Sequence, residues 1–243
     1  MASSAERGLD LGGVTAVVTG ASRGIGRAVA TRLAAAGSKV ALVARTVTEL
    51  EAAAASVGGE PFPADVSDEA SVERLFAAVS AAFGGVPEIV VNAAGAFGLA
   101  PIAETEVAAF DRQLASNLRA PFLVMRAVLP AMLARGSGHI LTIGSVAGRQ
   151  GFAGNGAYSA SKFGVVGLHA VLDAETVGTG VRATLVEPAA TATTLWDEVD
   201  RTRYPDLPST GAMMTVEAVA DVVVYALTRP REIAVRRLFL ERA

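Results

Sequence analysis

The chain alternates short runs of apolar, β-branched residues with longer segments that have the apolar spacing of helices. The clearest runs are 14–19 (VTAVVT) and 39–44 (KVALVA), each of the length of a single strand. Strands that are apolar throughout are buried on both faces, which is typical of a parallel sheet with helices packed on each side. The pattern therefore predicts an α/β fold with a doubly wound, mainly parallel sheet of seven strands.

The expected elements follow one another without an internal repeat or linker, so 1–243 is expected to be a single domain. Residues 1–13 are expected to be a flexible lead-in, and 189–212, which contain two prolines, an irregular segment. Strands are expected at 14–19, 39–44, 61–64, 87–91, 138–145, 181–187 and 233–240. Helices are expected to end near 37, to span 46–57, to run from a cap at Ser67 or Asp68 to 83, and to span 106–135, 158–177 and 216–228. The carboxyl ends of such strands share one edge of the sheet, where ligands bind.

The composition narrows the chemistry that the chain can perform. There are no cysteines, which excludes disulfides, thiolate catalysis and cysteine-bound metal. The two histidines, His139 and His169, are too few for a histidine metal cluster, so no metal is expected. A net charge of −3 gives no indication of nucleic acid or an anionic membrane as a partner. No apolar targeting segment is visible and no apolar run reaches a membrane span, so a cytoplasmic protein acting on a small molecule is expected.

A cluster of glycines follows the first predicted strand and opens the first predicted helix. The spacing Gly20-x-x-x-Gly24-x-Gly26 differs from the ordinary GxGxxG fingerprint, and it lacks the Gly-Lys-Ser/Thr of a Walker loop. Glycines allow a tight turn whose backbone N–H groups contact phosphate at the helix N-terminus. The turn therefore predicts a dinucleotide site, with a plain glycine-rich turn as the alternative. The residues expected to bind the cofactor here are Gly20, Ser22, Arg23, Gly24, Ile25 and Gly26.

The end of the second predicted strand indicates which dinucleotide binds. A carboxylate there, about twenty residues past the glycines, would bind the free ribose 2′-hydroxyl of NAD. The chain has Arg45 at this point, Arg23 lies in the glycine turn, and the nearest acid is Glu49. Two guanidiniums favour a 2′-phosphate, so NADP(H) is expected over NAD(H), unless both arginines are solvated surface residues. Asp65 and Val66 are candidates for the adenine contact, with helix capping as the alternative for Asp65.

Tyr158 and Lys162 lie four residues apart in the pattern Tyr-Ser-Ala-Ser-Lys. On a helix this spacing places both side chains on one face, one turn apart. An ammonium beside a phenol favours the phenolate, which lowers the phenol pKa and makes the phenol a usable general acid or base. Taken alone, such a pair is more often a surface contact than a catalytic pair, so the surrounding residues must decide.

Further motifs stand in a fixed order around this pair. They are the glycine turn, the segment Asn92-Ala-Ala-Gly95 after the fourth predicted strand, Asn117, and a thirteen-residue step from Ser145 to Tyr158. Together they resemble the short-chain dehydrogenase/reductase family in its compact, single-domain branch, over nearly the whole chain. The resemblance implies a Rossmann-type fold and an oxidoreductase that transfers a hydride between NADP(H) and a carbonyl or alcohol group.

The resemblance also implies a role for each residue near the nicotinamide. Tyr158 is expected to give a proton to the substrate oxygen, Lys162 to lower the pKa of Tyr158 and bind the nicotinamide ribose, and Ser145 to hold the carbonyl oxygen. Asn117 is expected to interrupt its helix and anchor a water that relays protons. The cofactor contacts implied beyond the glycine turn and Arg45 are Asp65, Val66, Asn92, Ala93, Gly95, Tyr158, Lys162, Pro188 and Thr193. The chain departs from the family pattern at Ala189, where glycine usually follows the proline.

The substrate is expected to be covered by the segment 189–212. Phe97, Phe152 and Trp196 are candidates to line its pocket, with ordinary packing as an equal alternative for each. Another activity of the family, 3-oxoacyl-carrier-protein reduction, is disfavoured because the C-terminal end lacks that branch's glycine-rich close. An alternative of another class is a non-catalytic dinucleotide-binding sensor or scaffold, which would keep the glycine turn and lose the chemical centre.

Assembly into a homodimer or homotetramer is implied by the same resemblance. In many family members the helices that carry Asn117 and Tyr158 pair with those of another subunit. The candidate interface residues, which could equally belong to the core, are Val124, Val128, Leu168 and Val171.

Overall fold

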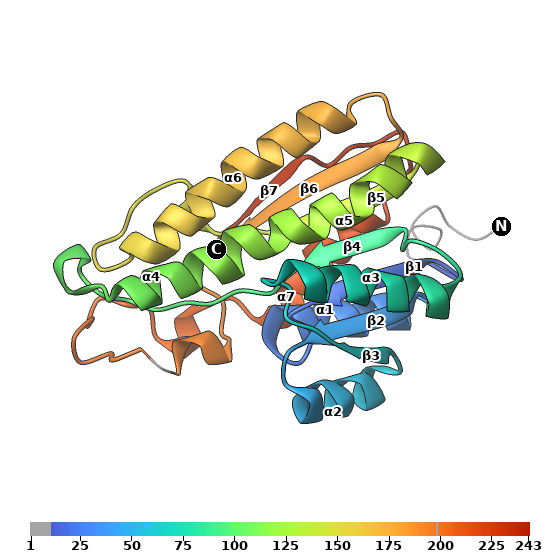
Figure 1. Ribbon diagram of the computed structural model, residues 1–243. Helices are drawn as coiled ribbons and strands as arrows, with labels where there is room; N and C mark the ends of the chain where they lie inside the picture. Colours follow the sequence, from blue (N-terminus) through green and yellow to red (C-terminus); the bar gives the residue numbers. More distant parts are fainter. Residues whose placement is uncertain (1–10, 198) are drawn as a thin grey trace.

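The computed structural model of the protein describes residues 11–197 and 199–243. Its centre is a seven-stranded sheet in the order β3-β2-β1-β4-β5-β6-β7, and every pairing between neighbouring strands is parallel. The prediction of a doubly wound, Rossmann-type sheet is confirmed (Figure 1). The strands are β1 (Thr15–Thr19), β2 (Lys39–Ala44), β3 (Glu60–Pro63), β4 (Ile89–Asn92), β5 (Gly138–Ile143), β6 (Val181–Pro188) and β7 (Arg237–Leu240).

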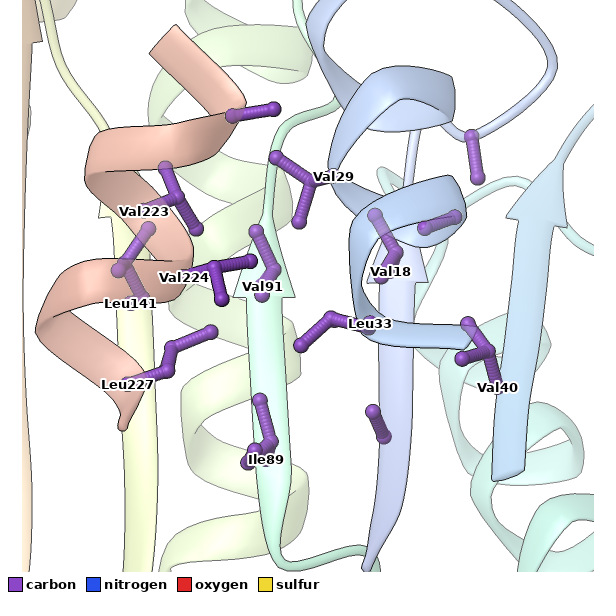
Figure 2. Packing of buried hydrophobic residues seen from close by; sticks show 14 of the residues in the cluster. Val18, Val29, Leu33, Val40, Ile89, Val91, Leu141, Val223, Val224 and Leu227 are labelled. Carbon is purple, nitrogen blue, oxygen red and sulfur yellow. The ribbon is translucent and has the colours of Figure 1, made fainter. Parts of the chain in front are cut away.

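Helices cover both faces of this sheet. They are α1 (Gly24–Ala35), α2 (Val47–Val57), α3 (Glu69–Phe83), α4 (Val107–Leu114), α5 (Ala120–Arg135), α6 (Gly156–Thr176) and α7 (Val216–Leu227). One apolar cluster joins α1, α2 and α7 to one face, and a second joins α3, α5 and α6 to the other. Figure 2 shows Val29 and Leu33 of α1 directed at the strands that carry Val18 and Val91, and all four are fully buried. Burial of each such side chain contributes about 1.5–3 kcal/mol to folding.

The strand order reverses between β1 and β4, and this reversal determines where a ligand can bind. Ligands in doubly wound sheets occupy the crevice at the carboxyl ends of the strands where the order reverses. Thr19 and Asn92 pair in register at the ends of β1 and β4. The glycine turn that follows β1 and the loop that follows β4 therefore lie together at this point.

The helix predicted at 106–135 changes geometry around Asn117. α4 leads into a π-helical turn, η3 (Ala115–Arg119), from which α5 continues. Such π turns are frequent at functional sites. By length and hydropathy, Val107–Arg135 is able to cross a membrane, whereas no apolar run of that length was expected from the sequence. In the fold it packs against α3, α6 and β5 in the manner of a core helix.

Two predicted details are settled by local hydrogen bonds. β7 begins at Arg237 instead of 233, because the N–H of Ile233 donates to the carbonyl oxygen of Pro230 (2.8 Å) in a turn. The cap of α3 is Asp68, whose carboxylate accepts from the N–H of Ser71 (2.7 Å). Asp65, the acidic residue between β3 and Asp68, is therefore not needed to cap α3.

The predicted lead-in at 1–13 lies mostly outside the described residues, which begin at 11. Leu11 itself is buried, with 8% of its surface exposed. Its N–H donates to the carbonyl oxygen of Ala36 (2.8 Å), so this residue packs at the end of α1.

The segment 189–212 is irregular in its described part, as predicted. Two short 3₁₀ turns, η5 (Thr194–Trp196) and η6 (Thr210–Ala212), are its only regular elements among the described residues. Figure 1 shows this segment in orange, at the left of the molecule, on the side where α6 begins. The loop therefore lies at the carboxyl ends of the strands, above the expected ligand crevice.

Residues near the C-terminus hold this segment in place. The N–H of Ala189 donates to the carbonyl oxygen of Leu240 (2.8 Å), which extends the pairing of β6 with β7. Arg242 donates to the backbone carbonyl oxygens of Gly211 and Met213. The two ends of the segment are thus tied to the last residues of the chain.

Candidate active site

A cavity of about 610 Å³ opens at the carboxyl ends of the strands. It is lined by the glycine turn, by loops that follow the strands, and by the segment 189–212. Every predicted site residue except Asn92 lines it: Gly20, Ser22, Arg23, Gly24, Ile25, Gly26, Arg45, Asp65, Val66, Ala93, Gly95, Phe97, Asn117, Ser145, Phe152, Tyr158, Lys162, Pro188, Thr193 and Trp196. Its size is that of a site for a cofactor or a small molecule.

The glycine turn requires glycine at two of its positions for steric reasons. A Cβ on Gly20, whose φ is +66°, would lie 2.7 Å from Cα of Ala94, and one on Gly26 would lie 2.3 Å from the carbonyl oxygen of Gly20. Thr19 fastens the neighbouring loop, because its Oγ1 accepts from the N–H groups of Ala93 and Ala94, both at 3.1 Å. The turn and the loop after β4 therefore form one close-packed backbone surface.

The start of α1 offers an anion site next to this surface. Arg23 occupies the N-cap position without a side-chain capping bond, and the first turn of α1 contains no acidic residue. Uncapped N–H groups and the helix dipole both favour a phosphate at such a terminus. Thr193 lies across the turn, with its Cγ2 3.5 Å from where a Cβ on Gly24 would stand. The residues present therefore fit a dinucleotide cofactor.

The cavity wall after β2 and β3 carries charges of both signs. Arg45, directly after β2, lines this wall. Glu49, in the first turn of α2, also lines it, although it was not predicted at the site from the sequence. The carboxylate of Asp65 accepts from the N–H (2.9 Å) and the hydroxyl (2.6 Å) of Ser67. Burial acts to raise the pKa of Asp65, but the bonds from Ser67 and the charge of Arg45 outweigh it, so the pKa is lowered. Asp65 does not cap α3, since Asp68 does so.

Asn92 is the one predicted residue that does not line the cavity. It ends β4 with 5% of its surface exposed, and its Nδ2 donates to Oγ1 of Thr142 on β5 (3.5 Å). The side chain lies between two strands, which explains why it does not reach the cavity. A cofactor contact of Asn92 stays a prediction.

Tyr158 and Ser145 meet at the cavity wall. Tyr158 lies in the first turn of α6, and Ser145 follows β5. Oγ of Ser145 accepts from the N–H of Ala147 (3.1 Å), which orients the hydroxyl. Burial raises the pKa of Tyr158 and a hydrogen bond with Ser145 lowers it by less, so the net direction is upward. The phenol is therefore protonated near neutral pH, which is the form that can donate a proton.

Lys162 is buried beneath Tyr158, one helical turn further along α6. Its Nζ donates to the carbonyl oxygen of Ile143 (2.9 Å) and lies 5.6 Å from the centroid of the Tyr158 ring. Burial lowers the pKa of Lys162 to about 8. The predicted lowering of the Tyr158 pKa by Lys162 is not observed, because burial of the phenol outweighs other effects and the ammonium is held at the Ile143 carbonyl.

Asn117 joins the loop after β4 to α6. Its Oδ1 accepts from the N–H of Ala96 (2.8 Å), while Nδ2 donates to the carbonyl oxygen of Ala96 (2.9 Å) and to Oγ of Ser161 (3.0 Å). Ser161 in turn donates to the carbonyl oxygen of Tyr158 (2.6 Å). The expected interruption of the helix is present as the π turn η3. The expected binding of a relay water stays a prediction.

Aromatic side chains form the cavity wall beside Tyr158. Phe97 packs edge to face on Tyr158 with ring centroids 4.9 Å apart, and it meets Trp196 at a tilt of 56° with ring centroids 4.8 Å apart. Nε1 of Trp196 donates to the carbonyl oxygen of Thr191 (2.9 Å), which fixes the indole. Phe152 also lines the cavity and is 43% exposed. Phe97 and Trp196 therefore both pack on neighbouring rings and line the cavity, and Phe152 lines it as well.

Sequence reasoning did not find two polar residues of the wall, Asn155 and Tyr204. Asn155 precedes Tyr158 by three residues, so the same helical spacing that selected Lys162 offered a signal. Tyr204 belongs to the irregular segment, where no periodicity indicates the direction of a side chain. Further lining residues that were not predicted include Leu99, Ser116, Ala147, Asp206 and Leu207.

Comparison with known proteins identifies the class of this site. Residues 14–203 match the family model described as short chain dehydrogenase. The chain therefore belongs to the short-chain dehydrogenase/reductase family, and it is an oxidoreductase of that family, as the motifs predicted.

Three similar proteins illustrate the range within the family. The chain is 38% identical over 239 residues to a glycine betaine reductase of Emericella nidulans, which covers 95% of this chain but only 19% of that protein's length. It is 39% identical over 224 residues to D-threitol dehydrogenase of Mycolicibacterium smegmatis, covering 88% of this chain and 86% of that protein. A crystal structure of a metagenomic short-chain oxidoreductase in complex with NADP superposes with a TM-score of 0.80 at 33% identity, covering 96% and 99% of the two chains.

Proposed function

We propose that the protein is an NADP(H)-dependent oxidoreductase that reduces a ketone or aldehyde to an alcohol, or catalyses the reverse reaction. The observation that carries this proposal is a single cavity shared by the glycine turn and by Ser145, Tyr158 and Lys162. Phosphate-binding backbone next to a buried, protonated phenol is what hydride transfer coupled to proton transfer requires. A non-catalytic sensor would have a broken chemical centre, whereas every residue of this centre reaches the cavity.

Each residue of the centre acts on the substrate oxygen or on a neighbour. Ser145 and Tyr158 donate hydrogen bonds to the carbonyl oxygen, which polarises the carbonyl, and Tyr158 then transfers its proton to that oxygen. Lys162, whose pKa is about 8, is protonated at neutral pH and can return a proton to Tyr158. Asn117 keeps α6 and the loop after β4 in fixed relation. When bound, the nicotinamide supplies or accepts the hydride.

The proposed preference for NADP(H) depends on Arg23 and Arg45. Both line the cavity on the side of the glycine turn and β2, where two guanidiniums favour a 2′-phosphate. The similar metagenomic oxidoreductase that was solved with NADP supports this choice. Glu49 and Asp65 on the same wall act in the opposite sense and offset the two guanidiniums in net charge, so the proposed preference rests on the hydrogen bonds that the guanidiniums can give to a phosphate.

We propose a small, soluble alcohol–carbonyl pair as the substrate, in preference to a 3-oxoacyl group on a carrier protein. The name of the D-threitol dehydrogenase indicates a polyol, and this chain spans 86% of that relative, which makes it a better guide than the glycine betaine reductase. We also propose that the chain acts as one cytoplasmic domain whose segment 189–212 closes over the substrate. This segment contributes Thr193, Leu195 and Trp196 to the cavity.

Assembly into a homodimer or homotetramer is proposed through the face formed by α4, α5 and α6. Phe122, Phe163 and Val171 are exposed there by 45%, 47% and 53%, which is unusual for large apolar side chains in one area. Val124 and Val128, two of the interface candidates from sequence, are fully buried and belong to the core. The spacing of apolar residues along α5 could not tell a core position from an interface position.

The experiment that tests the function follows loss of NADPH absorbance with a panel of small aldehydes and ketones, repeated with NADH. We expect faster turnover with NADPH, and we expect Arg45→Gln to reduce this preference about tenfold. Arg74→Gln, on the exposed surface of α3, is the matched control and should leave the preference unchanged. Faster turnover with NADH would contradict the cofactor assignment, and tight NADPH binding without turnover of any carbonyl compound would favour the sensor.

A further inference from the structure

Two polar side chains of the cavity wall lack a hydrogen-bond partner. Among the described residues that carry buried, unpaired polar atoms, only Asn155 and Tyr204 line the cavity. The unpaired atoms are Oδ1 of Asn155, a residue only 7% exposed, and the hydroxyl of Tyr204. Buried polar atoms are nearly always paired, because leaving one unpaired is destabilising. Two exceptions on one cavity wall therefore indicate a ligand that pairs with them.

Tyr204 lies beside the backbone that precedes Asn155, and Asn155 lies at the start of the helix that carries Tyr158. The carbonyl of Asn155 accepts from the N–H of Ser159 (2.8 Å) as α6 begins, but its side chain makes no capping bond. The ring of Tyr204 lies on Gly154, since a Cβ there would stand 2.8 Å from Cε1 and 3.2 Å from the hydroxyl oxygen. Tyr204 thus abuts the residue before Asn155, and Asn155 is one helical turn before the proposed proton donor.

The chemistry of these two groups selects a neutral hydroxyl as their partner. A hydroxyl can donate to the amide oxygen of Asn155 and accept from the phenol of Tyr204. If the amide oxygen and nitrogen exchange places, the hydroxyl can accept from the amide nitrogen instead. With Oδ1 of Asn155 as the unpaired atom, a carboxylate is disfavoured because it has no proton to give to that oxygen. An ammonium is disfavoured by the nearby guanidinium of Arg201, which lies 5.9 Å from the centroid of the Trp196 ring; Arg203, 5.8 Å from the centroid of the Tyr204 ring, is paired with Glu104.

We propose that Asn155 and Tyr204 form a specificity site for a hydroxyl group that the substrate carries near its reacting carbonyl. The preferred substrates are then hydroxy ketones, hydroxy aldehydes and the polyols derived from them. Phe97 and Trp196 contact the carbon skeleton between the two polar ends. This inference rests on the carbonyl chemistry proposed above and specifies which carbonyl compounds are used.

The test compares acetoin with butanone, which has the same carbon skeleton without the hydroxyl. With NADPH, the wild-type kcat/KM is expected to favour acetoin at least about tenfold, because the site's polar atoms stay unpaired with butanone. Tyr204→Phe and Asn155→Leu should each lower this ratio several-fold and leave kcat/KM for butanone nearly unchanged. Tyr225→Phe removes a hydroxyl from the exposed surface of α7, away from the cavity, and should leave the ratio as in the wild type.

A binding measurement separates this inference from the proposed reaction. Tyr158→Phe protein loaded with NADP⁺ is titrated with acetoin and with butanone by calorimetry, and acetoin should bind more tightly through Asn155 and Tyr204. Equal binding and equal kcat/KM for the two ketones would overturn the hydroxyl site while leaving carbonyl reduction intact. Turnover of neither ketone, with acetoin still bound more tightly, would overturn the reaction and keep the site. A preference that survives in both variants would also overturn the site.

Discussion

The two halves of the cavity are built in different ways. The cofactor half, formed by the loops after β1, β2, β3 and β4, consists largely of backbone, with a glycine turn in which a Cβ on Gly26 would stand 2.3 Å from a carbonyl oxygen. The substrate half, formed by Phe97 and by the loops after β5 and β6 including the segment 189–212, consists of side chains such as Trp196 and Tyr204. The glycine turn of the cofactor half therefore tolerates almost no added side chain, while the substrate half can be altered one side chain at a time.

This contrast fits a family whose similar members, a glycine betaine reductase and a D-threitol dehydrogenase, differ in the substrate they are named for. A backbone surface binds groups common to every dinucleotide, so its geometry can stay fixed. Side chains on irregular loops can change without moving the sheet, so they are suited to recognising different substrates. Tyr158 stands where the two halves meet, and variants of it should affect catalysis without affecting cofactor binding.

The largest effect is expected from Tyr158→Phe. Without the phenol hydroxyl no group donates a proton to the substrate oxygen, so turnover should fall by about a thousandfold. The affinity for NADPH, measured by fluorescence titration, should stay within about twofold, because the cofactor half is intact. Turnover close to that of the wild type would remove Tyr158 from the reaction.

Acid should destabilise the part of the fold beneath the substrate half, where the two histidines are buried, His139 in β5 and His169 in α6. Burial lowers the pKa of His139 to about 3 and that of His169 to about 4, whereas both titrate at 6.5 when unfolded. Because the folded pKa lies below the unfolded pKa, stability is complete above pH 6.5 and is lost as pH falls below it. At about pH 5 each histidine should cost about 2 kcal/mol.

Urea unfolding at neutral pH and at about pH 5 measures this loss. His169→Gln should reduce the difference between the two conditions by about half, since one of the two buried bases is gone. Asp65, whose pKa is lowered, loses its stabilising effect only at a lower pH than the histidines do, so it does not contribute to the difference between neutral pH and about pH 5. Equal stability at both pH values would show that the histidines are not kept neutral by burial.

Gly26→Ala tests the cofactor half. The added Cβ would approach the carbonyl oxygen of Gly20 to 2.3 Å, so the turn must shift and NADPH binding should weaken about a hundredfold. Gly167→Ala in α6 is the matched control, because a Cβ there meets nothing within 4 Å. The control should bind NADPH normally and gain about 0.5–1 kcal/mol in stability. Normal binding by Gly26→Ala would contradict the account of the turn.

Trp196→Phe tests the substrate half and should give the smallest effect. The variant loses the bond from Nε1 to Thr191 and part of the contact with Phe97, so kcat/KM for a carbonyl substrate should fall about threefold to tenfold. NADPH affinity should not change. A loss of NADPH affinity as large as that of Gly26→Ala would show that the two halves are not independent.

The same contrast explains how much of the molecule could be predicted from sequence. The glycine turn and the strand runs were predictable, because backbone geometry demands particular residues at fixed spacing. Asn117, Ser145, Tyr158 and Lys162 were predictable through their joint resemblance to a family, and the fold brings them to one cavity. Their roles in the reaction stay predictions until turnover is measured.

Other features could not be predicted, for physical reasons. The upward direction of the Tyr158 pKa depends on the depth of burial, which spacing along a helix does not report. The orientation of Asn92 into the sheet depends on its neighbour Thr142 from a distant strand. Tyr204 reaches the cavity from an irregular loop, where no periodicity applies. Val124 of α5 is buried while Val171 of α6 is exposed, because each residue's burial depends on which face of its helix is turned to the sheet.

The attachment of the segment 189–212 to the last residues of the chain has a practical consequence. Arg242 and Leu240 lie outside the cavity lining, yet they fix the two ends of the loop that forms much of the substrate half. Trimming the protein by its last few residues, or fusing a bulky tag there, should alter substrate scope before it weakens the sheet. Libraries designed to change that scope should therefore include positions near 240.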